Sequence, residues 1–130
     1  IPYVATASVA DLHDLEAKVT KAMSMHGARY IHVLVPCPLG WGSATSETIR
    51  VARMASESGL FPIFEAEQGE VTHSTPIRKL VPVEEYLKTQ TRFAHLFKPT
   101  RDEPRIAALE RLALNNIIRY NLLRTQEVKA

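Results

Sequence analysis

The chain contains 130 residues, of which 16 are lysine or arginine and 14 are aspartate or glutamate, so its net charge is +2 at pH 7. The basic residues form no dominant block, which argues against a nucleic-acid-binding surface, and no apolar run approaches the roughly 20 residues that span a bilayer. A single cysteine excludes an internal disulfide framework and suits a reducing compartment. We therefore expect a cytoplasmic protein without nucleic-acid or membrane partners.

The first 35 residues predict a β-α-β unit. Residues 3–9 are strand-like, and the helix that follows is expected to open at a capping box formed by Ser8 and Asp11. Apolar residues recur at helical spacing between residues 12 and 23, and Gly27 is typical of the position just past a helix. The β-branched run at 31–35 predicts a buried parallel strand, joined to the first by a right-handed crossover.

The only cysteine, Cys37, stands between Pro36 and Pro38 directly after the second strand. In open α/β sheets, ligands and cofactors gather at the carboxyl ends of the strands. The prolines stiffen this backbone and remove two N–H donors beside the sulfur, which predicts a low reduction potential for a cluster held there. Three interpretations of Cys37 are open at this point: a small buried apolar side chain, a metal ligand, and a nucleophile activated by a neighbouring base.

The segment from Gly40 to Ser43 has two glycines and precedes a helix expected at about 44–58. A phosphate-binding loop would need the Walker lysine and a longer spacing, so we interpret these glycines as turn residues. Trp41 is interpreted as a hydrophobic cover near Cys37 that would exclude water from a cluster.

The second half predicts a β-hairpin and two helices. Strands at 60–67 and 70–73 flank a Gly-containing turn, and Pro62 assigns this hairpin to an edge or peripheral position. A helix expected to begin at Pro82 carries an apolar stripe as far as Phe97, which we interpret as packing within the chain. The last helix, from Pro104, carries two apolar strips, and the second indicates docking onto another subunit. The expected parts are an α/β part at 1–59, a hairpin with an extended connection at 60–81 and a helical extension at 82–130.

The other chemistry-bearing residues form no recognisable motif. The five histidines are scattered without zinc-ligand spacing, and no Ser-His-Asp arrangement is indicated. His32, five positions before Cys37, is interpreted as a hydrogen-bonded core or interface residue. We therefore assign no catalytic residue and no cofactor-binding residue, and Cys37 is the single candidate metal ligand.

Three segments together resemble one family. They are Pro-Cys-Pro-Leu-Gly-Trp at 36–41, Ile-Pro-Tyr-Val-Ala-Thr-Ala-Ser-Val at 1–9 and Pro-Val-Glu-Glu-Tyr-Leu-Lys at 82–88. Their order and spacing resemble the beta subunit of 2-oxoacid:ferredoxin oxidoreductases of the pyruvate synthase type, over nearly the whole chain. The resemblance implies the C-terminal portion of a thiamine diphosphate-binding α/β fold, a parallel sheet with flanking helices, plus a peripheral β-hairpin and C-terminal helices.

The resemblance also implies a function. Such enzymes decarboxylate a 2-oxoacid oxidatively with thiamine diphosphate and Mg²⁺, usually form acyl-coenzyme A, and pass electrons through [4Fe–4S] clusters to ferredoxin. Cys37 matches the fourth cysteine ligand of the family's proximal cluster. The other three cysteines and the Gly-Asp-Gly…Asn thiamine motif have no match, so the cofactors would be bound mainly by an upstream segment of the same subunit. This segment alone is expected to be inactive.

Several alternatives accompany this hypothesis. Pyruvate is the default substrate, and an aryl or branched 2-oxoacid is the runner-up. The chain would also fit a non-catalytic subunit-interface module that uses its last two helices, or an unrelated small α/β enzyme with Cys37 as its nucleophile. The expected partners are the upstream segment, the other oxidoreductase subunits and ferredoxin or a similar electron acceptor.

Overall fold

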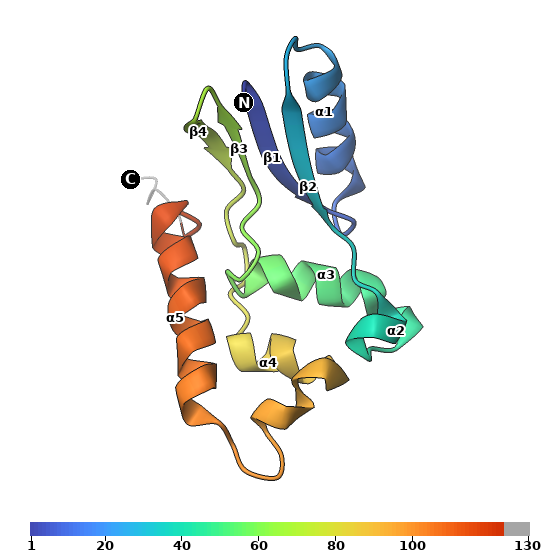
Figure 1. The fold of residues 1–130 in the computed structure, drawn as a ribbon, viewed down its shortest axis with the longest axis vertical. Helices are drawn as coiled ribbons and strands as arrows, with labels where there is room; N and C mark the ends of the chain where they lie inside the picture. The colour runs from blue at the N-terminus through green and yellow to red at the C-terminus, as the bar shows by residue number, and fades with distance from the viewer. Residues whose placement is uncertain (124–130) are drawn as a thin grey trace, which may run out of the picture.

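Residues 1–123 are described by a computed structural model, which has a sheet at one end and a group of helices at the other (Figure 1). Four strands form one mixed sheet in the order β2-β1-β3-β4. The strands are β1 (Tyr3–Ser8), β2 (Arg29–Leu34), β3 (Phe64–Glu67) and β4 (Glu70–Ser74). The helices are α1 (Leu12–Met23), α2 (Pro38–Trp41), α3 (Thr48–Glu57), α4 (Val83–Lys88) and α5 (Glu103–Arg119), with 3₁₀ turns η1 (Thr45–Glu47) and η2 (Thr91–Leu96).

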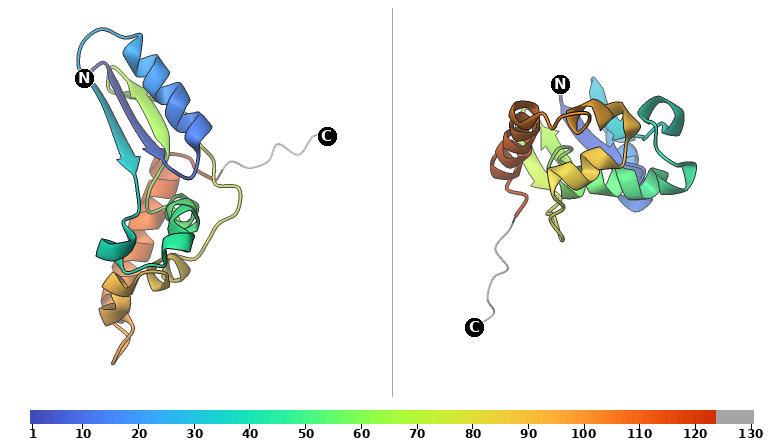
Figure 2. Two further views of the ribbon diagram at one scale, coloured as in Figure 1. Left: turned by 90° about the vertical axis from the view of Figure 1, so that its right-hand side faces the viewer. Right: turned by 90° about the horizontal axis from the view of Figure 1, so that it is seen from below.

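The predicted β-α-β unit is confirmed. Strands β1 and β2 pair in parallel, from Tyr3 opposite Arg29 to Ser8 opposite Leu34, and α1 lies against one face of the sheet (Figure 2). The capping box at Ser8 is wrong. Asp11 is the N-cap of α1 and accepts a hydrogen bond from the backbone N–H of Asp14 at 3.0 Å, because the chain first makes a turn in which the Ser8 hydroxyl accepts from the N–H of Ala10.

The predicted hairpin forms and extends the sheet on the side of β1 opposite β2. Its turn is made by Gln68 and Gly69, both with positive φ (51° and 87°), as expected of a two-residue hairpin loop. Strand β3 pairs antiparallel with β1. Pro62 lies outside the strand and does not interrupt the ladder, and its carbonyl oxygen accepts a 2.6 Å hydrogen bond from the hydroxyl of Thr6.

The main hydrophobic core lies in the helical part, between α3, α4, η2 and α5 (Figures 1 and 2). A smaller core lies between the sheet and α1. The predicted α/β fold class, with helices flanking the sheet, is therefore confirmed. The buried residues of the main core are Val51, Met54, Ala55, Val83, Tyr86, Leu87, Leu96, Ile106 and Ala113, and those of the smaller core are Tyr3, Ala5 and Ala22.

The continuous helix expected from Pro82 to Phe97 is wrong, although its apolar stripe does pack within the chain. Helix α4 ends at Lys88, and η2 begins at Thr91. Between them Gln90 is extended (φ −132°, ψ 120°). Its buried side-chain amide donates to the carbonyl oxygen of Tyr86 at 3.0 Å, which adds to the bonds from Thr89 that cap the end of α4.

Strand β2 is the edge of the sheet within residues 1–123, and the burial predicted for residues 31–35 is wrong, since none of them is buried. Parallel sheets are normally covered on both faces, yet Tyr30 on this strand is 54% exposed and Val35 just beyond it is 57% exposed. Helix α5 also leaves Leu112 and Ile118 exposed. Among residues 1–123, no helix has both the length and the apolar character needed to cross a membrane.

Candidate metal centre

Cys37 lies at the carboxyl end of β2, as the sequence predicts, but the segment that follows it is helical rather than an irregular loop. The strand ends at Leu34, and Cys37 is the N-cap of α2, a single helical turn whose first residue is Pro38. Proline suits this first position because its fixed φ is helical and its missing N–H would be unpaired there anyway. The two prolines thus set where the strand ends and where the turn begins.

The thiol of Cys37 is exposed, and its Sγ accepts a 3.5 Å hydrogen bond from the backbone N–H of Gly40. Because Cys37 is exposed among residues 1–123, the interpretation of it as a buried apolar side chain is wrong there. The hydrogen bond corrects the expectation that the prolines leave the sulfur without nearby donors. A donated N–H stabilises a thiolate and raises the potential of a cluster bound to it, so the low potential expected from the prolines alone does not follow.

The turn closes at Gly42, which adopts the left-handed conformation (φ 68°) and donates its N–H to the carbonyl oxygen of Pro38 at 2.9 Å. This agrees with the interpretation of Gly42 as a turn residue, whereas Gly40 lies within α2. The next residue, Ser43, has a buried hydroxyl oxygen with no hydrogen-bond partner among the described residues.

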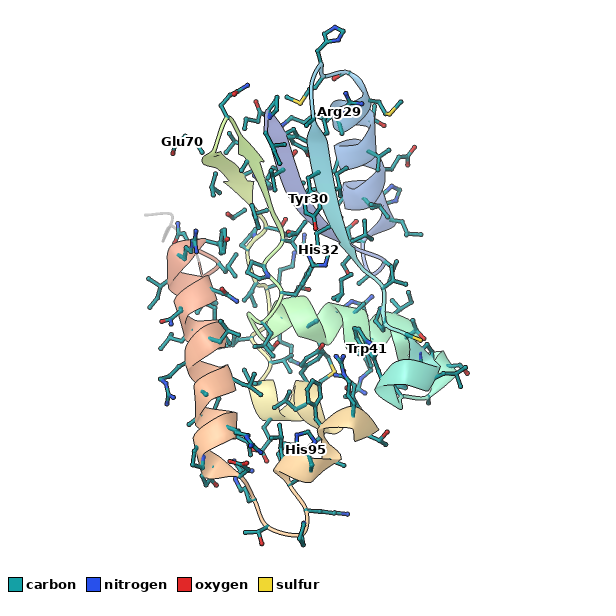
Figure 3. All side chains as sticks on the ribbon, in the orientation of Figure 1. Arg29, Tyr30, His32, Trp41, Glu70 and His95 are labelled. Carbon is teal, nitrogen blue, oxygen red and sulfur yellow. The ribbon has the colours of Figure 1, made fainter. Side chains whose placement is uncertain are left out.

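Trp41 connects the Cys37 turn to the helical part. Its backbone N–H donates to the carbonyl oxygen of Cys37 at 2.8 Å, and its half-buried ring packs against the main core. Figure 3 shows Trp41 on the side of α2 that faces the rest of the molecule. The guanidinium of Arg92 lies 3.9 Å from the centroid of the indole ring. Arg92 was missed by the sequence analysis, since nothing in the local pattern of η2 distinguishes it from any other exposed arginine.

Cys37 is the only cysteine in the 130 residues, whereas a cluster normally takes four cysteine ligands. His32 lies on β2 (Figure 3) and is exposed. Its ring packs edge-on against that of Phe61, with 5.2 Å between the ring centroids. Nowhere in residues 1–123 do three or more histidine, cysteine, aspartate or glutamate side chains gather as a metal site would require. Cys37 therefore fits a role as one thiolate of a cluster whose other ligands lie elsewhere, and it does not fit a complete site.

A half-open cavity of about 240 Å³ lies at the carboxyl end of β1, between α1, α3 and residues 75–78. Arg53, Glu57 and Arg78 are among the residues that line it. Asp11 and Asp14 also line it, but they already cap α1 and pair with Lys18. Because Cys37 is not among its lining residues, this cavity is separate from the candidate metal centre.

The fold and the site define an α/β segment that presents one exposed cysteine beyond a parallel strand. No family model matches the chain. It is 43% identical to the pyruvate synthase subunit PorB of Methanosarcina barkeri over 93% of its own length and 41% of the relative's. It is 47% identical to PorB of Methanocaldococcus jannaschii over 74% of its length and 32% of the relative's. It is 42% identical to the ketoisovalerate oxidoreductase subunit VorB of Pyrococcus abyssi over 75% and 32%.

The chain therefore belongs to the family of PorB and VorB subunits of 2-oxoacid:ferredoxin oxidoreductases. The predicted resemblance is confirmed. The chain spans 41% or less of the length of these three relatives.

Proposed function

We propose that this chain is the C-terminal part of the thiamine-binding subunit of a 2-oxoacid:ferredoxin oxidoreductase, in which Cys37 ligates a [4Fe–4S] cluster. The observation that carries the proposal is the exposed thiol of Cys37 at the carboxyl end of β2, on a turn fixed by Pro36 and Pro38. Iron–sulfur clusters are held by cysteine thiolates, and an exposed thiol on a rigid turn reaches such a cluster with little ordering cost.

Thiamine diphosphate, with Mg²⁺, supplies the carbanion stabilisation needed to decarboxylate a 2-oxoacid. This chain's own contribution is different. Cys37 would ligate the cluster through its thiolate, and the N–H of Gly40 donates to the sulfur of Cys37. Electrons would leave singly through such clusters toward ferredoxin, with coenzyme A as the acyl acceptor.

Pyruvate is the substrate we propose, because pyruvate synthase subunits are among the relatives with the highest identity. The VorB relatives carry the name ketoisovalerate oxidoreductase, which keeps a branched 2-oxoacid as the second candidate. The proposed partners are the remainder of the same subunit, the other subunits of the complex and ferredoxin, in the cytoplasm.

Replacing Cys37 in the intact complex tests the cluster assignment. Cys37→Ser should lower the iron content and alter the EPR spectrum of one cluster while thiamine diphosphate still binds. Ferredoxin reduction should fall far more than decarboxylation itself. Leu39→Ala is the matched control, because Leu39 lies on the same turn and is 96% exposed. Unchanged iron content together with an unchanged spectrum in Cys37→Ser would end the proposal.

A panel of 2-oxoacids assayed on the complex with a viologen dye tests the substrate. Reduction fastest with pyruvate supports the first candidate, and reduction fastest with 2-ketoisovalerate or an aryl 2-oxoacid supports the second. No dye reduction with any 2-oxoacid would contradict oxidoreductase function of the complex.

A further inference from the structure

We propose that Thr91 and Arg92, at the start of η2, are positioning residues that hold α2, the turn capped by Cys37, against the helical core. These contacts fix the direction in which Cys37 Sγ points. The inference rests on the proposed function only in taking that sulfur as a cluster ligand. Residues 91 and 92 lie more than fifty positions from Cys37 in the sequence, but η2 packs against α2 in the fold.

The first contact joins the backbones of Thr91 and Gly42. The N–H of Thr91 donates to the carbonyl oxygen of Gly42 at 3.1 Å. A Cβ atom built on Gly42 would lie 1.6 Å from the Thr91 hydroxyl oxygen and 2.9 Å from its Cβ. Glycine is therefore required at position 42 both by its positive φ and by the close approach of η2.

The second contact is the stacking of the Arg92 guanidinium on the ring of Trp41. The guanidinium carbon lies 3.9 Å from the centroid of the indole ring, within the range of a cation–π contact. Its Nε donates to the side-chain oxygen of Gln90 at 2.9 Å. Gln90 is 2% exposed and donates in turn to the carbonyl oxygen of Tyr86 at 3.0 Å. The buried glutamine thus orients the exposed arginine over the ring.

Both contacts act on Cys37 through the hydrogen bonds of a single turn. Trp41 donates its N–H to the carbonyl oxygen of Cys37 at 2.8 Å, and Gly42 donates to that of Pro38 at 2.9 Å. A one-turn helix is too short to be stable by itself. Contacts that hold its end at Trp41 and Gly42 therefore hold its beginning at Cys37 as well.

Arg92 also carries a positive charge that forms no ion pair with a carboxylate in residues 1–123, where its side chain contacts Gln90 and the rings of Trp41 and Phe93. A nearby positive charge favours the more negative, reduced state of a cluster. Loss of the charge should therefore lower the midpoint potential of the cluster at Cys37, and a variant that keeps the charge separates this effect from loss of the stack.

Variants of Gly42 in the intact complex test the backbone contact. Gly42→Ala should weaken the EPR signal of the cluster that Cys37→Ser affects, and should speed alkylation of Cys37 in iron-depleted enzyme, followed by mass spectrometry of its peptide. Gly69→Ala is the matched control, because Gly69 also has a positive φ (87°) but nothing within 4 Å of an added Cβ. The double variant Gly42→Ala/Thr91→Gly removes the clash and should restore part of the signal.

Variants of Arg92 test the stack without requiring a backbone change, so they remain informative if Gly42→Ala does not fold. Arg92→Gln should lower the midpoint potential of the cluster and alter its EPR spectrum, and Arg92→Lys, which keeps the charge, should restore the potential more than the spectrum. If Cys37→Ser changes the cluster but Arg92→Gln leaves the potential and spectrum as in the wild type, the positioning role is wrong. If Cys37→Ser itself changes nothing, the proposed function has failed instead.

Discussion

The helical part of the chain buries large apolar side chains such as Leu87 and Ile106, whereas the sheet part buries mainly Tyr3 and a few alanines. The helical core is closed by four elements that pack on one another. The sheet is covered by α1 on one face and leaves the edge strand β2 open. The helical part therefore encloses its core with its own residues, whereas the sheet part leaves one strand uncovered.

This difference matters for Cys37, which lies where the two parts meet. Its sequence context assigns it to the end of strand β2, in the open part. Its turn, however, is held by Trp41 and Gly42 against η2, in the closed part. The cysteine is thus supplied by the weakly packed sheet and oriented by the well-packed helices.

The largest expected effect is a cavity in the helical core. Leu87→Ala removes a side chain that is 1% exposed, and such a truncation should lower the free energy of unfolding by about 2–5 kcal/mol. Val35→Ala, at the exposed end of β2, should cost less than about 0.5 kcal/mol. Urea unfolding of both variants measures the contrast, and equal losses would show that the two parts do not differ as described.

An intermediate effect is expected in the smaller core of the sheet part. The hydroxyl of Tyr3 donates to Glu65 Oε1 at 2.6 Å, and burial followed by this bond raises the pKa of Tyr3. Because the acceptor is charged, Tyr3→Phe should lower the free energy of unfolding by about 1.5–3 kcal/mol at pH 7. Tyr30→Phe, on the exposed strand β2, is the matched control and should have almost no effect.

The same variant should be sensitive to pH. Burial raises the pKa of Glu65, but hydrogen bonds from Tyr3 and Lys21 outweigh it, so the pKa lies below its ordinary value of 4.5. A lowered carboxyl pKa stabilises the folded state above pH 4.5, and this stabilisation is lost as the pH falls through the folded value. The difference between wild type and Tyr3→Phe should shrink from pH 7 toward acid. A difference that grows in acid would contradict this account.

The smallest effect is expected at the surface of the helical part. Hydrogen bonds from Arg101 and Lys88 lower the pKa of Glu84 to about 2, and the bond from Arg101 connects α4 to the segment before α5. Because these groups are exposed, their interaction is screened by solvent and salt. Glu84→Gln should destabilise the chain less than Tyr3→Phe does. This destabilisation should appear as the pH rises from about 2 to 4.5, and it should be smaller in high salt. A loss that is insensitive to salt would indicate a buried role for Glu84.

The sequence predicted those features that depend on neighbouring residues. The β-branched run indicated strand β2, Pro36 indicated its end, and the single cysteine indicated the candidate ligand. Gly27 was expected just past the first helix, but α1 ends at Met23 and is capped by Ser24. The break at Gln90 was not predictable, because the apolar stripe keeps its helical spacing across it. The contacts of Arg92 with Trp41 and of Thr91 with Gly42 were not predictable either, since they join distant segments that only the folded core brings together.

The open edge of β2 has a practical consequence for handling this chain on its own. Its outward N–H and C=O groups form a template on which a strand from a second molecule can add, and the exposed ring of Tyr30 offers apolar surface beside it. Charged and proline residues that discourage such addition lie only at the two ends, at Arg29 and Pro36. Self-association through this strand is therefore the first cause to examine if the isolated chain precipitates, and a lysine at position 30 is the simplest remedy.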